Sequence, residues 1–141
     1  MNFRPDTPVC ATPWAHGCFE GNGLIVSWCV GHLVSPMDAA GYDPGYKKWK
    51  YDDLPILPEP FRYVLAKDKE DAFQNLKRLM DREDVTELVN ACYAGREGEL
   101  IFRLVYEMAG CQKPFSRLWI SSMEDAAIRE GFADLRPGAE Y

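Results

Sequence analysis

The sequence has no long hydrophobic run and no cysteine pairing pattern. None of its apolar stretches approaches the roughly 20 residues that span a bilayer, and its first residues, Met1 to Asp6, lack the apolar core of a secretory signal. The 5 cysteines are odd in number and none forms a C-x-x-C pair, which argues against a disulfide framework and a zinc site. We therefore expect a cytoplasmic protein with reduced thiols and no membrane partner.

Positive charge is also scarce. The chain has 16 Lys and Arg residues against 22 Asp and Glu residues, giving a net charge of −6 at pH 7. Proteins bind duplex DNA mainly by neutralising its phosphates, so an acidic chain must gather its positive charge on one face to do the same. The densest basic cluster, Lys47 to Lys50, is short. Composition alone therefore disfavours independent DNA binding.

The chain has the size and composition of one globular domain. Its 141 residues, 47% hydrophobic and 27% charged, are enough to bury a core. Pro5, Pro8 and Pro13 interrupt the first 17 residues, and proline removes hydrogen-bond donors that a central strand or helix needs. We predict an irregular N-terminal arm over residues 1–17 and a folded domain over residues 18–141.

The first half alternates strand and turn signals. Gly21 to Gly23 predicts a hairpin turn, followed by a strand over 24–30. Residues 35–60 predict a long excursion in which aromatic side chains give material to pack. A strand over 61–66 then leads to a helix over about 69–82, capped by Asp68. The apolar stripe of this helix consists of Phe73, Leu76, Leu79 and Met80.

The second half repeats a strand–helix rhythm. A strand over 86–92 and a glycine-containing turn precede a helix that Gly110 ends. A strand over 117–120 follows, and Ser121 with Glu124 forms a capping-box pattern that opens a last helix. Strands that alternate with helices indicate an α/β domain with a mainly parallel sheet flanked by helices.

The segment from Asn90 to Arg103 carries the strongest chemical signal. It predicts a strand, a small-residue turn and a helix N-terminus, whose free N–H groups and dipole attract anions. Arg96 can clamp a phosphate, whereas Glu97 and Glu99 can offer oxygen ligands to Mg²⁺. On spacing alone the simpler alternative stands beside these roles, because glutamates are favourable in the first turn of any helix.

Further motifs run in order through the chain from about Phe19 to Tyr141: Glu20-Gly21-Asn22-Gly23, Val26-Ser27-Trp28-Cys29-Val30-Gly31-His32-Leu33, Lys47-Lys48-Trp49, Leu54-Pro55-Ile56-Leu57-Pro58, Tyr106-Glu107, Ala109-Gly110-Cys111, Arg117-Leu118-Trp119-Ile120-Ser121-Ser122-Met123 and Ala133-Asp134-Leu135. With the 90–103 segment, they resemble the Toprim portion of type IA DNA topoisomerases, in particular bacterial, mobile-element-associated topoisomerase III enzymes. The resemblance implies a Toprim-like, Rossmann-like fold.

The resemblance also implies an acidic Mg²⁺ site, from which this sequence departs. Tyr93 stands where the family has its first aspartate, and Gly95 stands at the second, as in the topoisomerase III subclass. Glu97 matches the last acid and Arg96 the adjacent arginine. The first family strand and its glutamate are missing or replaced by the proline-broken arm. Because Mg²⁺ prefers several oxygen ligands, the implied Mg²⁺ cofactor is doubtful here; Glu97 and Glu99 are weak metal candidates, and Glu97 is the candidate catalytic residue.

Four functions remain open at this stage. The first is a topoisomerase III-like Toprim module that is not competent for topoisomerase catalysis alone, because the domain that supplies the family's catalytic tyrosine is expected to be absent, and that keeps a weak DNA contact. The second is a protein-interaction module recast to bind another protein, such as a nucleic-acid enzyme. The third is a small Mg²⁺-dependent nuclease with Glu99 or Glu20 as replacement acids. The fourth is a gene remnant with no independent role.

The remaining candidates concern phosphate and protein contacts. We expect Gly95, Arg96 and Gly98 at a phosphate site, with His32 either touching a phosphate or serving as a hydrogen-bonded structural histidine. Lys47 and Lys48, among aromatic residues, predict either a single-strand DNA patch or a solvated loop. Loss of the first family strand would leave an open sheet edge, which favours self-association or a protein partner.

Overall fold

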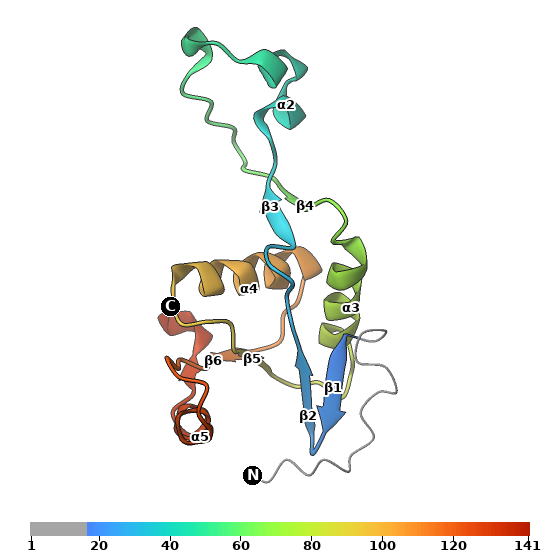
Figure 1. Cartoon of the computed structure of the whole chain (residues 1–141). Helices are drawn as coiled ribbons and strands as arrows, with labels where there is room; N and C mark the ends of the chain where they lie inside the picture. Colours follow the sequence, from blue (N-terminus) through green and yellow to red (C-terminus); the bar gives the residue numbers. More distant parts are fainter. Residues whose placement is uncertain (1–16) are drawn as a thin grey trace.

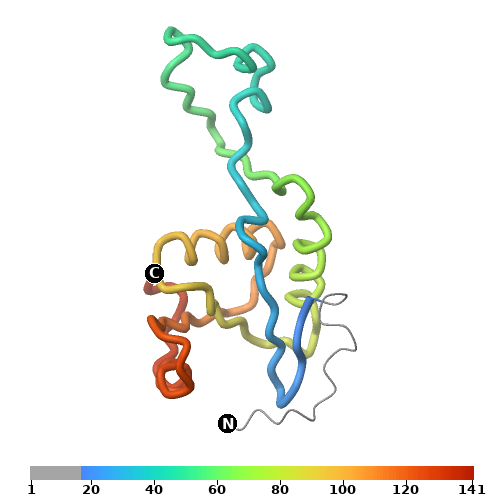
Figure 2. Tube along the Cα trace, in the orientation of Figure 1, coloured from blue at the N-terminus to red at the C-terminus, as the bar shows by residue number. Residues whose placement is uncertain are grey.

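The structure, a computed structural model, describes residues 17–141. The predicted N-terminal arm lies outside this range except for Gly17, and so does the place of a first family strand. The described chain is a mixed α/β fold in which a body carries a long projection (Figures 1 and 2). Its strands are β1 (Cys18–Gly21), β2 (Leu24–Ser27), β3 (Val34–Pro36), β4 (Tyr63–Leu65), β5 (Leu88–Asn90), β6 (Phe115–Arg117) and β7 (Arg136–Pro137). Its helices are α2 (Ala39–Tyr42), α3 (Glu70–Met80), α4 (Arg96–Ala109) and α5 (Asp125–Ala133), with 3₁₀ helices η1 (Pro44–Lys48), η2 (Tyr51–Asp53) and η3 (Gly138–Glu140).

Strands β1 and β2 form the predicted hairpin. Gly21 pairs with Leu24 at its end, so the loop has only two residues. Asn22 and Gly23 both have positive φ angles, 53° and 76°, as a tight hairpin turn requires. Glu20 then anchors the hairpin to the end of α3, because its carboxylate accepts two hydrogen bonds from Arg82, at 2.9 and 2.8 Å. The local turn prediction is confirmed.

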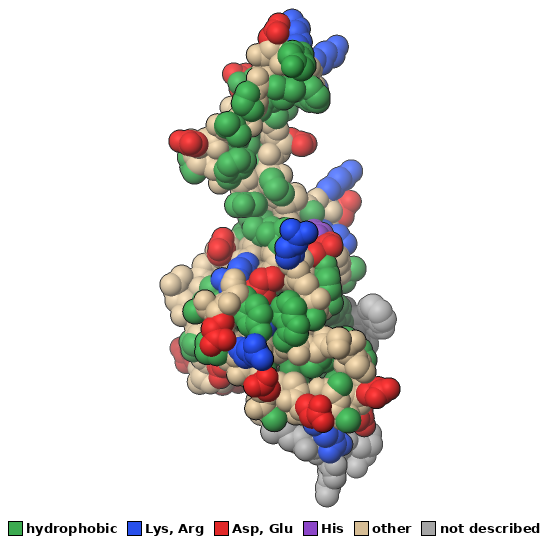
Figure 3. Space-filling model, turned by 90° about the vertical axis from the view of Figure 1, so that its left-hand side faces the viewer, with side chains coloured by type: hydrophobic (Ala, Val, Ile, Leu, Met, Phe, Trp, Pro, Cys, Tyr) green, Lys and Arg blue, Asp and Glu red, His purple; other side chains and the backbone are tan. Residues whose placement is uncertain are grey.

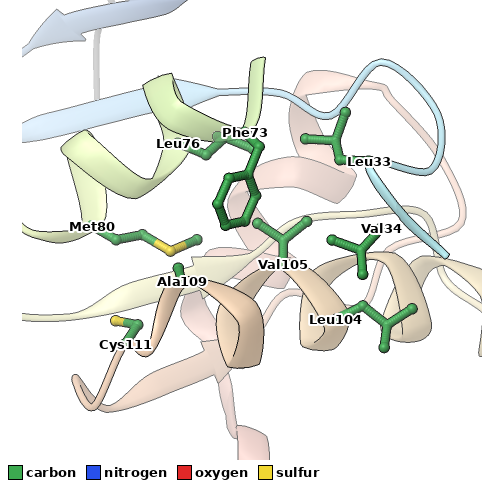
Figure 4. Packing of buried hydrophobic residues seen from close by; sticks show 9 residues of the cluster. All are labelled: Leu33, Val34, Phe73, Leu76, Met80, Leu104, Val105, Ala109 and Cys111. Carbon is green, nitrogen blue, oxygen red and sulfur yellow. The ribbon is translucent and has the colours of Figure 1, made fainter. Parts of the chain in front are cut away.

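The core lies between α3, α4 and the start of β3. All four residues of the predicted α3 stripe are buried, and three of them, Phe73, Leu76 and Met80, pack with Leu33, Val34 and residues of α4 (Figure 4). The buried cluster consists of Leu33, Val34, Phe73, Leu76, Met80, Leu104, Val105, Ala109 and Cys111. Gly110 ends α4 with a left-handed φ of 69°, as predicted.

The α/β class is confirmed, but the strands form three small sheets: β1–β2, β3–β4 and β5–β6–β7. Among the described residues only β5 and β6 pair in parallel. The connections explain this outcome. The α4 crossover returns the chain to pair β6 beside β5 in the same direction, whereas the hairpin and the projection turn the chain back on itself and produce antiparallel pairs.

The long excursion forms the projection, which we define as residues 37–62. Strands β3 and β4 pair antiparallel at its base, and it extends away from the body as α2, η1 and η2 (Figures 1 and 2). Arg62 closes the base: its carbonyl accepts from Met37 N at 2.8 Å, and its guanidinium lies 5.4 Å from the Tyr42 ring centre. The predicted excursion is present, but the predicted packing is not, because none of its three short helices buries a residue.

Two predicted caps are wrong. Asp68 has a φ of 60°, and α3 begins after Lys69 without a side-chain cap. Ser121 does not cap α5 either; Ser122 Oγ accepts from Glu124 N at 3.2 Å instead. Both helices keep acidic residues in the first turn, which the helix dipole favours. Within residues 17–141, no helix is long and apolar enough to cross a membrane.

Candidate nucleic-acid interface at the Gly95–Gly98 turn

The turn between β5 and α4 is compact. Gly95 lies at the start of α4, and its carbonyl accepts from Glu99 N at 3.2 Å. Gly98 is buried in the first helical turn, where an added Cβ would lie 2.2 Å from the Tyr93 carbonyl oxygen. Atoms do not approach so closely without moving, so only glycine allows the loop to fold onto the helix here.

Arg117 binds the backbone that leads from β5 into this turn. Its side chain is completely buried at the end of β6. Nη1 donates to the carbonyl oxygens of Asn90 and Cys92, at 2.8 and 2.7 Å, and Nη2 donates to Tyr93 O at 2.8 Å. Its guanidinium also lies 5.0 Å from the centre of the Trp119 ring. One buried cation therefore fixes three backbone carbonyls of the strand end and the turn.

Glu99 supplies the charge that balances this cation. Its side chain is only 15% exposed. Oε1 accepts from Arg103 Nε at 2.7 Å, Oε2 accepts from Asn90 Nδ2 at 2.8 Å, and Oε2 lies 3.2 Å from Arg117 Nε. That last contact is an electrostatic one, since Arg117 Nε has no aligned hydrogen bond. Glu99 thus has a structural role, and its oxygens are committed to the protein.

Glu97 lies on the exposed side of the same helical turn. His32 Nε2 lies 3.0 Å from its Oε1, so the histidine that follows β2 is hydrogen-bonded, as the structural alternative predicted. A hydrogen bond from Tyr93, and then that of His32, holds the pKa of Glu97 below its usual value. Partial burial, and then the hydrogen bond with Glu97, raises the pKa of the Tyr93 phenol. Tyr93, Glu97 and His32 therefore form one exposed polar cluster.

Arg96, the first residue of α4, is exposed, and its side chain makes no ion pair or hydrogen bond within residues 17–141. The structure thus brings together Gly95, Arg96, Glu97, Gly98 and His32. It does not bring in Lys47 and Lys48, which end η1 in the projection (Figure 1). Glu20, the other replacement acid considered, is paired with Arg82 instead.

Comparison with known proteins identifies the relatives of this chain. DNA topoisomerase 3 of Bacillus subtilis is 47% identical over 126 residues, which are 89% of this chain and 17% of that protein. The enzymes of the same name from Shouchella clausii and Bacillus licheniformis are each 45% identical over the same shares. The chain is homologous to a segment of DNA topoisomerase 3. It spans 17% of the length of these relatives, and no family model matches it.

The Mg²⁺ ion that a topoisomerase-like module implies does not fit the described residues. Glu97 is shared between His32 and Tyr93, and both oxygens of Glu99 face cationic or amide groups. In residues 17–141 there is no group of three or more His, Cys, Asp or Glu residues that could hold a metal ion. Magnesium prefers several oxygen ligands, and the only exposed carboxylate among the described residues of this turn, that of Glu97, already contacts His32.

The sequence did not lead us to the buried residues that support the Gly95–Gly98 turn. Asn90 and Arg117 are the buried polar residues of the described chain, and neither was singled out as a site residue. A signal was present: an arginine beside Leu118-Trp119-Ile120 and an asparagine ending an apolar strand are both unusual in a core. Such residues are buried only when they are paired, so each indicates a partner.

Proposed function

We propose that this chain is a DNA-contacting module of the topoisomerase 3 type that does not relax DNA by itself. The observation that carries the proposal is Arg96. It is exposed at the N-terminus of α4 and has no partner within residues 17–141, in a chain that is 47% identical to a DNA topoisomerase 3 segment. A guanidinium beside free helix N–H groups is complementary to a phosphate in charge and in hydrogen-bond geometry.

The state of the other arginines supports this choice. Arg82, Arg103, Arg117 and Arg136 each pair with a carboxylate, and Arg62 lies over an aromatic ring. Among the described arginines, Arg96, Arg78 and Arg129 have neither a carboxylate nor a ring partner, and of these Arg96 lies at the Gly95–Gly98 turn. Its neighbour Glu97 is hydrogen-bonded by Tyr93 and His32, and it forms no ion pair with Arg96 within residues 17–141.

The absence of relaxation activity follows from the carboxylates. Cleavage supported by a metal ion requires oxygen ligands that hold the ion beside the phosphate. Glu97 and Glu99 are both engaged by protein groups. We expect no relaxation of a supercoiled plasmid with Mg²⁺ or Mn²⁺; relaxation by the purified chain would contradict this part of the proposal.

Phosphate contact is tested by fluorescence anisotropy with a labelled single-stranded oligonucleotide at low salt. Arg96→Ala should weaken binding and lower the slope of log affinity against log salt by about 0.7, the value for one phosphate on a single strand. The matched control is Arg129→Ala, which removes another exposed arginine, on α5, that has no partner within residues 17–141. Equal affinities for wild type and Arg96→Ala would exclude this role.

A second candidate function, association with another polypeptide, rests on the edge of β5. Within the described residues β5 pairs only with β6. Leu88 N and Asn90 O bond towards β6, so the backbone groups of Val89 point towards the other edge. An unpaired edge can accept a further strand. Light scattering over a concentration series checks self-association; a constant monomer mass would count against it.

A further inference from the structure

The tip of the projection combines exposed rings with lysines that form no ion pair within residues 17–141. Residues 47–51 read Lys-Lys-Trp-Lys-Tyr. The Trp49 and Tyr51 side chains are 59% and 87% exposed, and neither ring stacks on another ring within residues 17–141. Figure 3 shows positively charged side chains at this far end of the molecule, with an acidic side chain beside them. Together these groups form a surface that the protein leaves open.

Of the acidic side chains next to the tip in sequence, Asp52 is exposed, whereas Asp43 and Asp53 accept hydrogen bonds from the backbone. Asp43 Oδ1 accepts from Gly45 N at 2.7 Å, and Asp53 Oδ2 accepts from Lys50 N at 2.7 Å. Neither carboxylate forms an ion pair with a lysine of the tip, and Lys47, Lys48 and Lys50 form no ion pair with any described residue. Three lysines thus stand within residues 47–50, none of them paired with a carboxylate of the described chain, although the whole chain has a net charge of −6.

The backbone holds the two rings apart. Trp49 and Lys50 are extended, with φ/ψ of −60°/147° and −112°/170°. An extended chain rises about 3.3 Å per residue, so Trp49 and Tyr51 lie about two rises apart along the backbone. Each ring therefore has a free face for a separate flat group.

We infer that the tip, residues 47–51, is a contact site for single-stranded nucleic acid, separate from the Gly95–Gly98 turn. Unpaired bases stack on Trp49 and Tyr51, and the lysines neutralise the flanking phosphates; aromatic platforms set among cations bind single strands in this way without sequence preference. A duplex keeps its base faces stacked inside, so the exposed rings favour single strands over double strands. The site goes beyond the function proposed above, because Arg96 plays no part in it.

The test compares anisotropy titrations of a labelled oligothymidine for variants of the tip. Trp49→Ala should bind about tenfold more weakly, since a base–ring stack contributes about that much, and Trp49→Phe should restore most of the affinity. Lys47→Gln/Lys48→Gln should lower the salt slope by about 1.4, or 0.7 for each phosphate contact. Leu57→Ala is the matched control: Leu57 is exposed in the same projection, and its loss should change nothing.

The outcomes separate this site from the turn. If the tip variants lose affinity and Arg96→Ala does not, the tip inference stands and the role of Arg96 fails; the reverse result overturns the tip inference alone. Equal binding of single strands and duplex, or an equal loss in Leu57→Ala, would also overturn it. So would a change of oligomeric mass in Trp49→Ala with oligothymidine affinity retained, because the tip would then be a protein contact.

Discussion

The body and the projection both carry large apolar side chains, but only the body buries them. Leu33 is fully buried between α3 and α4, whereas Leu57 in the projection is 71% exposed. The polar groups differ in the same way: Arg117 is enclosed by carbonyls and a carboxylate, and the lysines of the tip have no carboxylate partner among the described residues. The body therefore holds its groups by their mutual contacts, and the projection presents its groups outward.

The largest effect should come from the buried arginine. Arg117→Met removes the donor to three backbone carbonyls and one of the two cations that face Glu99, and breaking a buried ion pair costs about 3–5 kcal/mol. Arg62→Met, the matched change in the projection, removes only a contact with the Tyr42 ring and should cost less than about 1 kcal/mol. Urea denaturation followed by circular dichroism measures both. Similar midpoints for the two variants would show that the arginines are equivalent.

A leucine pair tests the same contrast for packing. Leu33→Ala opens a cavity in the core and should lower the free energy of unfolding by about 2–5 kcal/mol. Leu57→Ala removes a side chain that is mostly in water and should change stability by less than about 0.5 kcal/mol. A large loss in Leu57→Ala would mean that the projection is packed in solution, through self-association for example.

A glycine pair compares the two loops. An alanine Cβ at position 98 would lie 2.2 Å from the Tyr93 carbonyl oxygen, so Gly98→Ala should cost about 1–3 kcal/mol through overpacking. At Gly45 the nearest atom is an Asp43 side-chain oxygen at 3.1 Å, which can move, and the cost should stay below about 0.5 kcal/mol. Thermal melts give both values, and wild-type stability in Gly98→Ala would contradict the close contact.

Features set by neighbours in the sequence could be predicted, and those set by distant contacts could not. Asn22-Gly23 and Gly110 adopt the positive φ angles that their residue types favour, and the α3 stripe follows the helical period. Arg117, in contrast, donates to carbonyls 24 to 27 residues earlier in the chain, which no local pattern encodes. The aromatic residues of the projection did not show whether they would be buried, because that depends on which other segments lie next to them in the fold.

The α/β class could be predicted from the sequence, but only part of the candidate site could. The β5–α4–β6 unit follows from the strand–helix rhythm, so the parallel pair and the position of Gly95–Gly98 were predictable. The partition of the glutamates was not. Glu97 and Glu99 are two residues apart and look alike in sequence, yet one is exposed beside His32 and the other is mostly enclosed between two arginines.

The smallest expected effect concerns exposed groups of the body, which, unlike the lysines of the tip, form hydrogen bonds with one another. The group measured is the Glu97 carboxyl. Tyr93→Phe removes the hydrogen bond that contributes most to lowering the pKa of Glu97, so the pKa of that carboxyl should rise towards its ordinary value. His32→Gln, which removes the weaker contribution, should raise it less. Carbon-detected NMR titration of the glutamate carboxyls measures both.

A lowered folded-state pKa gives stability that is present above the unfolded-state pKa and is lost as the pH falls through the folded-state value. Tyr93→Phe should therefore lose less stability than wild type on acidification, and an unchanged Glu97 pKa in this variant would show that the phenol does not donate to the carboxylate.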